Sequence, residues 1–142
     1  MIAIASDHGG YNLKVKIIEH LTEKGLEVKD YGCYSTDSCD YPDMVRPAAQ
    51  AVASGEAERG IVICTTGIGV SIVCNKISGI RCALCTTVTM ARLTREDNDS
   101  NILALGAGIT GEFLALDIVD TWLNTEFSQM EKHQRRIDKI EG

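Results

Sequence analysis

Residues 60–71 read GIVICTTGIGVS, an apolar run that passes through a glycine-containing turn into a second apolar segment. The first five positions are rich in β-branched residues and apolar on both faces, which predicts a fully buried strand of a parallel sheet. Gly67 and Gly69 permit a sharp turn, and we expect a helix to begin after Gly69. The segment is therefore interpreted as one βα unit.

The same alternation of short apolar runs and longer amphipathic segments extends over the whole chain. It predicts an α/β fold whose strands form one parallel sheet. Strands are expected at residues 2–6, 27–31, 60–64, 81–85 and 101–106. Helices are expected at 11–24, at 42–54, beyond 69, at 87–95 and at 111–124, the last with Phe113, Leu114, Ile118 and Leu123 available to pack on the sheet.

The chain has 142 residues, of which 20 are acidic and 14 basic, with a formal net charge of −6. This length fits a single domain over residues 1–142, and about 68–70% of the unfolded surface is buried at this size without a disulfide or metal. The acidic balance argues against sequence-independent nucleic-acid binding. No apolar run reaches the ~20 residues of a membrane span, and the N-terminus lacks a signal-peptide pattern, which predicts a cytoplasmic protein.

The six cysteines are expected to be free and buried, since four of them lie inside apolar stretches. Cys82 and Cys85 have the C-x-x-C spacing of redox and zinc motifs. They lie, however, in the strand predicted at 81–85, where residues three apart point to opposite faces. We interpret them as packing residues, with a thiol-redox function as the alternative. The three histidines are widely separated, so no metal site is expected.

The loops beyond the carboxyl ends of the strands are where an open parallel sheet places its ligand crevice. These loops read SDHGG at 6–10, CTTGIGVS at 64–71 and GAGITG at 106–111. The amides of a glycine turn and the positive potential of a helix N-terminus hold an anion or a developing oxyanion. Cys64 stands beside these amides, where that potential favours the thiolate that acts as nucleophile or base. The alternative is a tight β–α turn with an inert packing cysteine.

Three other polar segments have both a functional and a structural interpretation. Asp7 and His8 follow the first strand and are together expected to face a ligand, although Asp7 alone fits a helix N-cap. Residues 40–43, DYPD, open a helix and fit a turn with a proline start. Residues 95–101, REDNDSN, form a charged cluster that by itself fits a solvated helix end.

The C-terminal segment 127–140, FSQMEKHQRRIDKI, is polar nearly all round. A helix of this kind seldom packs on its own domain. We therefore expect it to be a helix that reaches a partner subunit.

Five segments together resemble ribose-5-phosphate isomerase B, a family that includes the subunits of galactose-6-phosphate isomerase. They are SDHGG at 6–10, DYPD at 40–43, GIVICTTGIGVSIVCNKISGIR at 60–81, ARLTREDNDSNILALG at 91–106 and LDIVDTWL at 116–123. The resemblance covers essentially the whole chain. It implies a three-layer α/β/α sandwich with a five-stranded parallel, Rossmann-like sheet. It also implies a homodimer or homotetramer with its active site between subunits, no metal or organic cofactor, and the interconversion of an aldose phosphate and a ketose phosphate through an enediolate.

The resemblance further implies roles for individual residues. Cys64 aligns with the base of one branch of the family, Thr66 with a threonine implicated in ring opening or proton shuttling, and Asp97 with the ring-opening position. The anion hole is matched by the amides of Gly67, Ile68, Gly69, Val70 and Ser71. Sugar- and phosphate-contacting positions are matched by Asp7, His8, Tyr41, Asn98, Lys132 and Arg136, the last two flanking His133.

Four departures from the family pattern bear on specificity. Asp97 stands where the family has its ring-opening histidine. Thr65 stands where the family has a glycine directly after the cysteine that acts as base. Gly108 stands where a phosphate-binding arginine is expected, and Lys132 replaces another arginine with a point charge that cannot fork. At ~1.5–3 kcal/mol for each charge-assisted hydrogen bond, the changes at 97 and 108 predict phosphate affinity lower by roughly two to four orders of magnitude. Potential replacement cations are Arg46, Arg92, Arg95 and Arg135.

Two functions follow from these observations. We predict an aldose–ketose isomerase that acts on a pentose or hexose phosphate, with Cys64 as the base that removes a carbon-bound proton. The alternative is a sugar- or sugar-phosphate-binding protein of the same family that has kept the fold and lost turnover.

Overall fold

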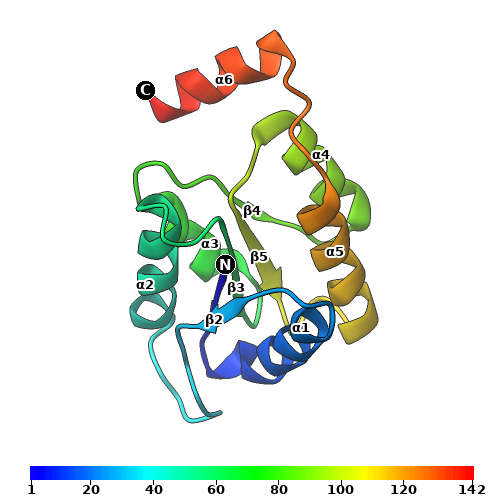
Figure 1. Cartoon of the computed structure of the whole chain (residues 1–142). Helices are drawn as coiled ribbons and strands as arrows, with labels where there is room; N and C mark the ends of the chain where they lie inside the picture. The colour runs from blue at the N-terminus through cyan, green and yellow to red at the C-terminus, as the bar shows by residue number, and fades with distance from the viewer.

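A five-stranded, all-parallel sheet forms the centre of the computed structural model, which describes all 142 residues (Figure 1). The strands are β1 (Ile2–Ser6), β2 (Val28–Asp30), β3 (Arg59–Cys64), β4 (Cys82–Leu84) and β5 (Ile102–Gly106). Their order is β2-β1-β3-β5-β4, so β3 is central and pairs with β1 and β5. The helices are α1 (Tyr11–Glu23), α2 (Tyr41–Ala53), α3 (Ile68–Asn75), α4 (Val88–Asn98), α5 (Glu112–Asn124) and α6 (Glu131–Glu141), with a short 3₁₀ helix η1 (His8–Gly10) after β1.

Two helical layers cover the sheet because side chains alternate between its faces along each strand. Ile2 and Ile4 of β1 point to the face covered by α1, α4 and α5 (Figure 1). Ala3 and Ala5 point to the opposite face, which α2 and α3 cover. Burial on both sides explains why the central strands are apolar without interruption. The three-layer α/β/α architecture expected from the sequence is thereby confirmed.

The element boundaries differ from the predicted ones mainly at the edges of the sheet. β2 and β4, the two edge strands, have three residues each. α3 begins at Ile68, before Gly69 rather than after it. α4 continues beyond residue 95 to Asn98, and Asp99, with a left-handed φ of 45°, ends it.

The packing face predicted for α5 is wrong in part. Ile118 is buried as expected, but Phe113 is 83% exposed and Leu114 is exposed as well. The helix packs on the sheet with the stripe formed by Ala115, Ile118, Val119 and Trp122. Trp122 lies seven positions after Ala115, so helical spacing from the tryptophan identifies the buried face.

Cys82 and Cys85 diverge to opposite faces of the sheet, as the strand interpretation predicts. Cys82 packs against the α2–α3 side and Cys85 is buried on the side of α1, α4 and α5. A hydrogen bond with Cys74, followed by burial, raises the pKa of Cys82 well above its usual value, and burial raises the pKa of Cys85 to about 11. All six cysteines are free. Both thiols therefore stay protonated near neutral pH, which disfavours the thiol-redox alternative.

α6 stands apart from the two helical layers, beyond the amino-terminal ends of the strands (Figure 1). It begins at Glu131, four residues later than the predicted 127. One turn contacts the end of α4 through the buried Ile137, and Arg81 bridges to Glu141 at 2.8 Å. Apart from the partly buried His133 and the exposed Ile140, the remaining side chains of the helix are polar and exposed. None of the helices combines the length and apolar character needed to cross a membrane.

Candidate active site

The glycine turn after β3 is held in place by close packing of the backbone. Gly67 caps α3 with a left-handed φ of 78°. A Cβ at this position would lie 2.6 Å from Leu84 Cδ1 and 2.8 Å from the carbonyl carbon of Leu105. Only glycine satisfies both the dihedral angle and the space, so the turn that precedes α3 has a single conformation.

The sulfur of Cys64 points into this turn. Cys64 is the last residue of β3, and the Gly67 amide donates a hydrogen bond to its Sγ at 3.1 Å. The residue is 6% exposed, so its sulfur is largely shielded from water. The sulfur therefore lies at the N-terminus of α3, in contact with a backbone amide donor.

Two amides at the start of α3 have no acceptor within the protein. Of the five amides expected to form an anion hole, Gly67 donates to Cys64, Ile68 donates to Thr66 Oγ1 at 3.2 Å, and Ser71 donates to the Gly67 carbonyl. The amides of Gly69 and Val70 donate to no protein atom. Both lie in the first turn of α3, where the helix dipole is positive. Gly69 is partly exposed, so its amide is open to a substrate oxygen, whereas Val70 is fully buried.

Tyr41 covers the same turn. It is the first residue of α2, and a Cβ on Gly69 would lie 3.0 Å from the Tyr41 hydroxyl oxygen. The absence of a side chain at Gly69 therefore lets the phenol approach the first turn of α3. The tyrosine is 38% exposed, and its hydroxyl lies close to the Gly69 backbone.

The loop after β1 supplies Asp7 and His8. Asp7 is buried and caps η1, because the Gly10 amide donates to its Oδ1 at 3.1 Å. His8 Nδ1 accepts from the Cys39 amide at 3.2 Å, which leaves Nε2 as the protonated nitrogen of the neutral ring. The N-cap interpretation of Asp7 is confirmed, and the amide contact orients the His8 ring.

Thr65 fills the space between the loop after β1 and the loop after β5. A Cβ at Gly9 would collide with Thr65 Oγ1, and a Cβ at Gly108 would lie 2.9 Å from Thr65 Cγ2. The Gly108 amide donates to the Thr65 carbonyl at 2.8 Å. Thr65 and Gly108, two of the positions that depart from the family pattern, are thus in contact, because the Thr65 side chain packs against Gly108.

A second group of expected site residues lies around the end of α4 and the start of α6. Asp97 Oδ1 is 3.2 Å from His133 Nδ1. These two residues share a cavity of about 180 Å³ with Asn98 and Arg136. Lys132 is exposed and does not line this cavity.

The two groups lie at opposite ends of the sheet. Cys64 pairs with Gly106 at the carboxyl end of β5, whereas Asp97 and Asn98 precede Ile102 at its amino end. The four residue steps from Ile102 to Gly106 span about 13 Å along the strand. Within one chain, the structure therefore brings the expected residues together as two separate regions. We call them the carboxyl-edge region (Asp7, His8, Tyr41, and Cys64 to Ser71) and the amino-edge region (Asp97, Asn98, Lys132, His133 and Arg136).

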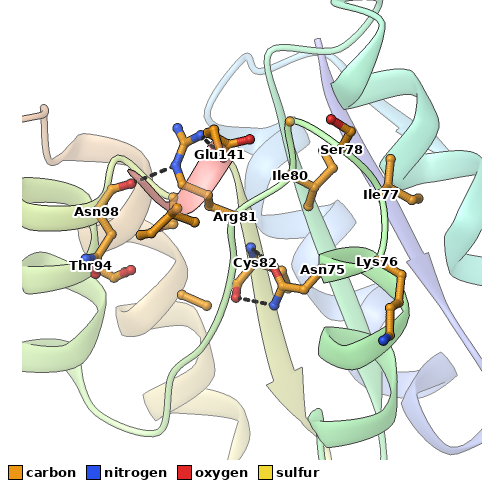
Figure 2. Close-up of a pocket in the computed structure, with 14 residues that line it drawn as sticks. Asn75, Lys76, Ile77, Ser78, Ile80, Arg81, Cys82, Thr94, Asn98 and Glu141 are labelled. Carbon is orange, nitrogen blue, oxygen red and sulfur yellow. Dashed lines mark hydrogen bonds and ion pairs between the residues drawn. The ribbon is translucent and has the colours of Figure 1, made fainter. Parts of the chain in front are cut away.

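The largest cavity, about 560 Å³, adjoins the amino-edge region and not Cys64 (Figure 2). Arg81 lies between α4 and α6 there, and its guanidinium donates to the Asn98 carbonyl at 2.9 Å and to Glu141 at 2.8 Å. Asn75 is paired with the backbone of Cys82 on the opposite wall. The cavity is a gap between three helix ends, and Asn75, Arg81 and Glu141 on its walls are already paired within the protein. Sequence reasoning did not identify Arg81, because only its contact with α6 distinguishes it.

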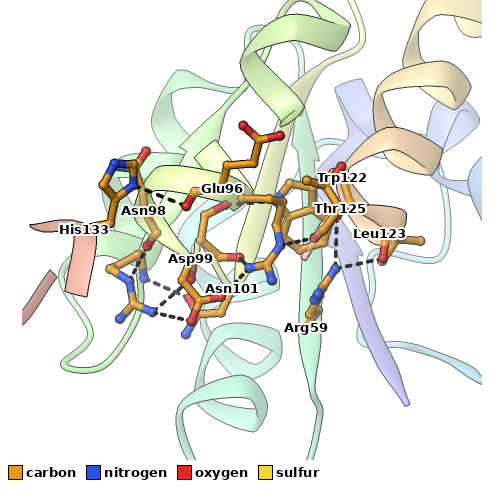
Figure 3. Close-up of polar contacts among 12 residues, drawn as sticks. Arg59, Glu96, Asn98, Asp99, Asn101, Trp122, Leu123, Thr125 and His133 are labelled. Atoms are coloured by element: carbon orange, nitrogen blue, oxygen red, sulfur yellow. Dashed lines mark hydrogen bonds and ion pairs between the residues drawn. The ribbon is translucent and has the colours of Figure 1, made fainter. Parts of the chain in front are cut away.

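A polar network fixes the end of α4 (Figure 3). The buried Arg95 donates to the carbonyls of Ser100 and Thr125 at 2.6 and 3.0 Å and pairs with Asp99 at 2.7 Å. His133 contacts the Glu96 carbonyl at 3.4 Å. Arg95 is therefore a structural residue. It does not serve as a replacement cation for substrate.

Fold and site together define a class of α/β enzyme. A thiol and unpaired amides meet at the carboxyl edge of a parallel sheet, where such folds bind small substrates and stabilise developing negative charge.

Comparisons with known proteins agree with this class. The family model described as Ribose/Galactose Isomerase matches residues 2–140. The chain is 45% identical to ribose-5-phosphate isomerase B of Escherichia coli over 139 residues, covering 98% of this chain and 93% of that protein. It is 51% identical to a putative sugar phosphate isomerase of Bacillus subtilis over 140 residues, covering 98% and 93%. The structure of ribose-5-phosphate isomerase B from Clostridium thermocellum superposes with a TM-score of 0.97 at 56% identity, covering 99% and 94%. The chain belongs to the ribose/galactose isomerase family and is a sugar-phosphate isomerase.

Proposed function

We propose that this isomerase interconverts a pentose or hexose phosphate with its ketose, as in the ribose 5-phosphate to ribulose 5-phosphate reaction, with Cys64 as the carbon base. The observation that carries the proposal is the Cys64 sulfur, 3.1 Å from the Gly67 amide and beside the unpaired amides of Gly69 and Val70. A base and an oxyanion site on the same turn are the two groups that an enediolate reaction requires.

The chemistry assigns each of these groups a step. The thiolate of Cys64 removes the proton from C2 of the open-chain aldose and returns it to C1. The amide of Gly69 donates to the oxygen that becomes negative, and it needs no rearrangement because the helix holds it. Thr66 stands between Cys64 and the helix and transfers protons between the O1 and O2 hydroxyls. Asp7, His8 Nε2 and the Tyr41 hydroxyl bind the sugar hydroxyls or phosphate.

The amino-edge region completes the site from a second copy of the chain. Asp97, Asn98, Lys132 and Arg136 lie too far along the sheet to reach the sulfur of their own chain. In a two-fold dimer, each carboxyl-edge region meets the amino-edge region of its partner, which makes two equal sites. The segment 127–140, including α6, then crosses to the partner.

The edge strand β4 supports a homodimer. It has no neighbour on its outer side, and exposed apolar side chains flank it on α3 and α4. They are Ile68, Ile72, Met90 and Leu93. A homotetramer built from two such dimers is the alternative assembly.

Phosphate preference is weaker than in relatives that carry an arginine at position 108. Gly108 provides no cation, and Thr65 occupies the adjoining space. Arg136 and Lys132 are then the main charges for the phosphate. Arg92 is engaged with Glu96 at 3.2 Å.

The test is solvent-deuterium exchange. The protein is incubated in deuterated water with ribose 5-phosphate, allose 6-phosphate and the free sugars, and label is measured at C1 and C2. Cys64→Ala is expected to slow exchange by about 10²–10⁴-fold. Exchange by Cys64→Ala at the wild-type rate overturns Cys64 as the base, and the absence of exchange with every sugar overturns isomerisation of these substrates.

A further inference from the structure

The amino-edge region holds an imidazole and a carboxylate in direct contact, and the mechanism above leaves the imidazole without a role. We infer that His133, oriented by Asp97, is the group that opens the sugar ring in the two-chain site. This inference rests on the proposed isomerase function. It gives His133 the role that the family gives to the histidine replaced here by Asp97.

The geometry defines which nitrogen of His133 acts. Asp97 Oδ1 lies 3.2 Å from Nδ1, and the Glu96 carbonyl oxygen lies 3.4 Å from the same nitrogen. Both neighbours are acceptors, so Nδ1 carries the proton and Nε2 keeps its lone pair. A carboxylate that holds an imidazole in one tautomer is the arrangement by which histidine becomes an efficient base.

His133 is positioned before any substrate binds. Its side chain is 12% exposed and lines the cavity of about 180 Å³ that also holds Asn98 and Arg136. The end of α4 is fixed by Arg95, and α6 is anchored by Ile137 and by the Arg81–Glu141 pair. The His133 imidazole therefore lies between two fixed elements, its own helix α6 and the end of α4, which limits its reorientation.

Ring opening moves one proton from O1 to O4, and a single imidazole can carry it. The proton of the anomeric hydroxyl O1 passes to Nε2, the C1–O4 bond breaks, and the C1=O1 carbonyl forms. The imidazolium then gives one proton to O4, so the ring is opened with no other reactant. Asp97 stabilises the imidazolium during this step and is a positioning residue. Arg136, one turn further along α6, faces the same cavity and is placed to bind the phosphate.

The experiment separates ring opening from carbon chemistry by the choice of substrate. Ribose 5-phosphate is mostly a furanose and must be opened. Ribulose 5-phosphate has its O5 esterified, so it forms no such ring. We compare turnover of ribose 5-phosphate with deuterium exchange at C1 of ribulose 5-phosphate for the wild type, His133→Asn, His133→Gln, Asp97→Asn and Asp97→Glu.

Both His133 variants are expected to lose about 100-fold or more of ribose 5-phosphate turnover and to keep the exchange of ribulose 5-phosphate near the wild-type rate. Asp97→Asn is expected to lose about 10–100-fold in the same substrate-selective way, and Asp97→Glu to recover part of it. The matched control is His20→Asn, which removes a histidine that contacts Asp120 at 2.8 Å away from both regions. It should leave both rates unchanged.

Equal losses with both substrates, or no loss with either, overturn the role of His133. Failure of the wild type with both substrates overturns the proposed pentose-phosphate reaction, and with it this inference. Circular dichroism and the oligomeric state of each variant identify any loss that comes from misfolding, and the second variant at each position then decides the outcome.

Discussion

The carboxyl-edge and amino-edge regions are built by different means. In the first, backbone amides, glycines and a buried sulfur form a rigid turn, and the side chains mainly secure its shape. In the second, charged and polar side chains at the end of α4 and on α6 line a cavity. The difference teaches that the geometry around Cys64 is fixed mainly by the backbone of the fold, whereas the geometry of the amino-edge region is fixed by side chains that substitution readily changes.

The largest effect is expected from mixing variants that damage different regions. Cys64→Ala and Arg136→Ala are each expected to be nearly inactive as homodimers. Co-expressed in equal amounts, they give heterodimers in which one of the two sites has both regions intact, so activity should return to about a quarter of the wild-type value. Isomerase assays on the tag-purified mixture measure this.

The control for the mixing experiment is Cys64→Ala co-expressed with the double variant Cys64→Ala/Arg136→Ala. Every site in that mixture lacks the sulfur, and no activity should return. Activity no higher in the first mixture than in this control would show that both regions serve a site within one chain.

A stability comparison sharpens the contrast between backbone and side chains. Gly67→Ala must adopt a φ of 78° and place a Cβ against Leu84 and Leu105, so the free energy of unfolding should fall by at least about 2 kcal/mol. Gly111→Ala has an ordinary φ of −68° and open space, and should change it by less than about 1 kcal/mol. Lys132→Ala in the amino-edge region should stay within about 0.5 kcal/mol. Chemical denaturation measures all three.

The contact between Thr65 and Gly108 predicts that their substitutions are not additive. Gly108→Arg alone introduces a Cβ 2.9 Å from Thr65 Cγ2 and should lower stability without improving phosphate binding. Thr65→Gly/Gly108→Arg removes this clash and should lower the KM for ribose 5-phosphate by about tenfold, through one charge-assisted hydrogen bond. A single Gly108→Arg variant that matches the double variant in KM and stability would contradict the coupling.

The smallest effect concerns the histidine–aspartate pair that lies outside both regions. Burial opposes ionisation of Asp120, but hydrogen bonds from Lys24 and His20 outweigh it and lower the pKa of this carboxyl. A lowered folded-state pKa means that the pair stabilises the fold above the unfolded value near 3.9, and that this contribution disappears as the pH falls through the lower, folded-state pKa. Asp120→Asn should therefore flatten the acid limb of a stability–pH curve below about pH 4. Its isomerase activity at neutral pH should equal that of the wild type.

Much of the carboxyl-edge region could be predicted because its determinants are local. An apolar run, a glycine turn and the next helix are adjacent in the sequence, and Cys64, Gly67 and Gly69 fall on them in order. The amino-edge region could be assigned only by family resemblance. Its partners, Asp97 on α4 and His133 on α6, are separated by a whole strand and helix, and no local pattern records their contact.

By itself, the sequence determined the parallel α/β sheet, its two buried faces, and the turn that presents Cys64 to free amides, because hydrophobic periodicity and glycine conformation act over a few neighbouring residues. Only the tertiary structure decided that Phe113 faces solvent, that Thr65 fills the space beside Gly108, and that the residues of one family site divide between opposite ends of the sheet. Those outcomes depend on how distant segments pack, and packing is settled by the shape of the whole fold.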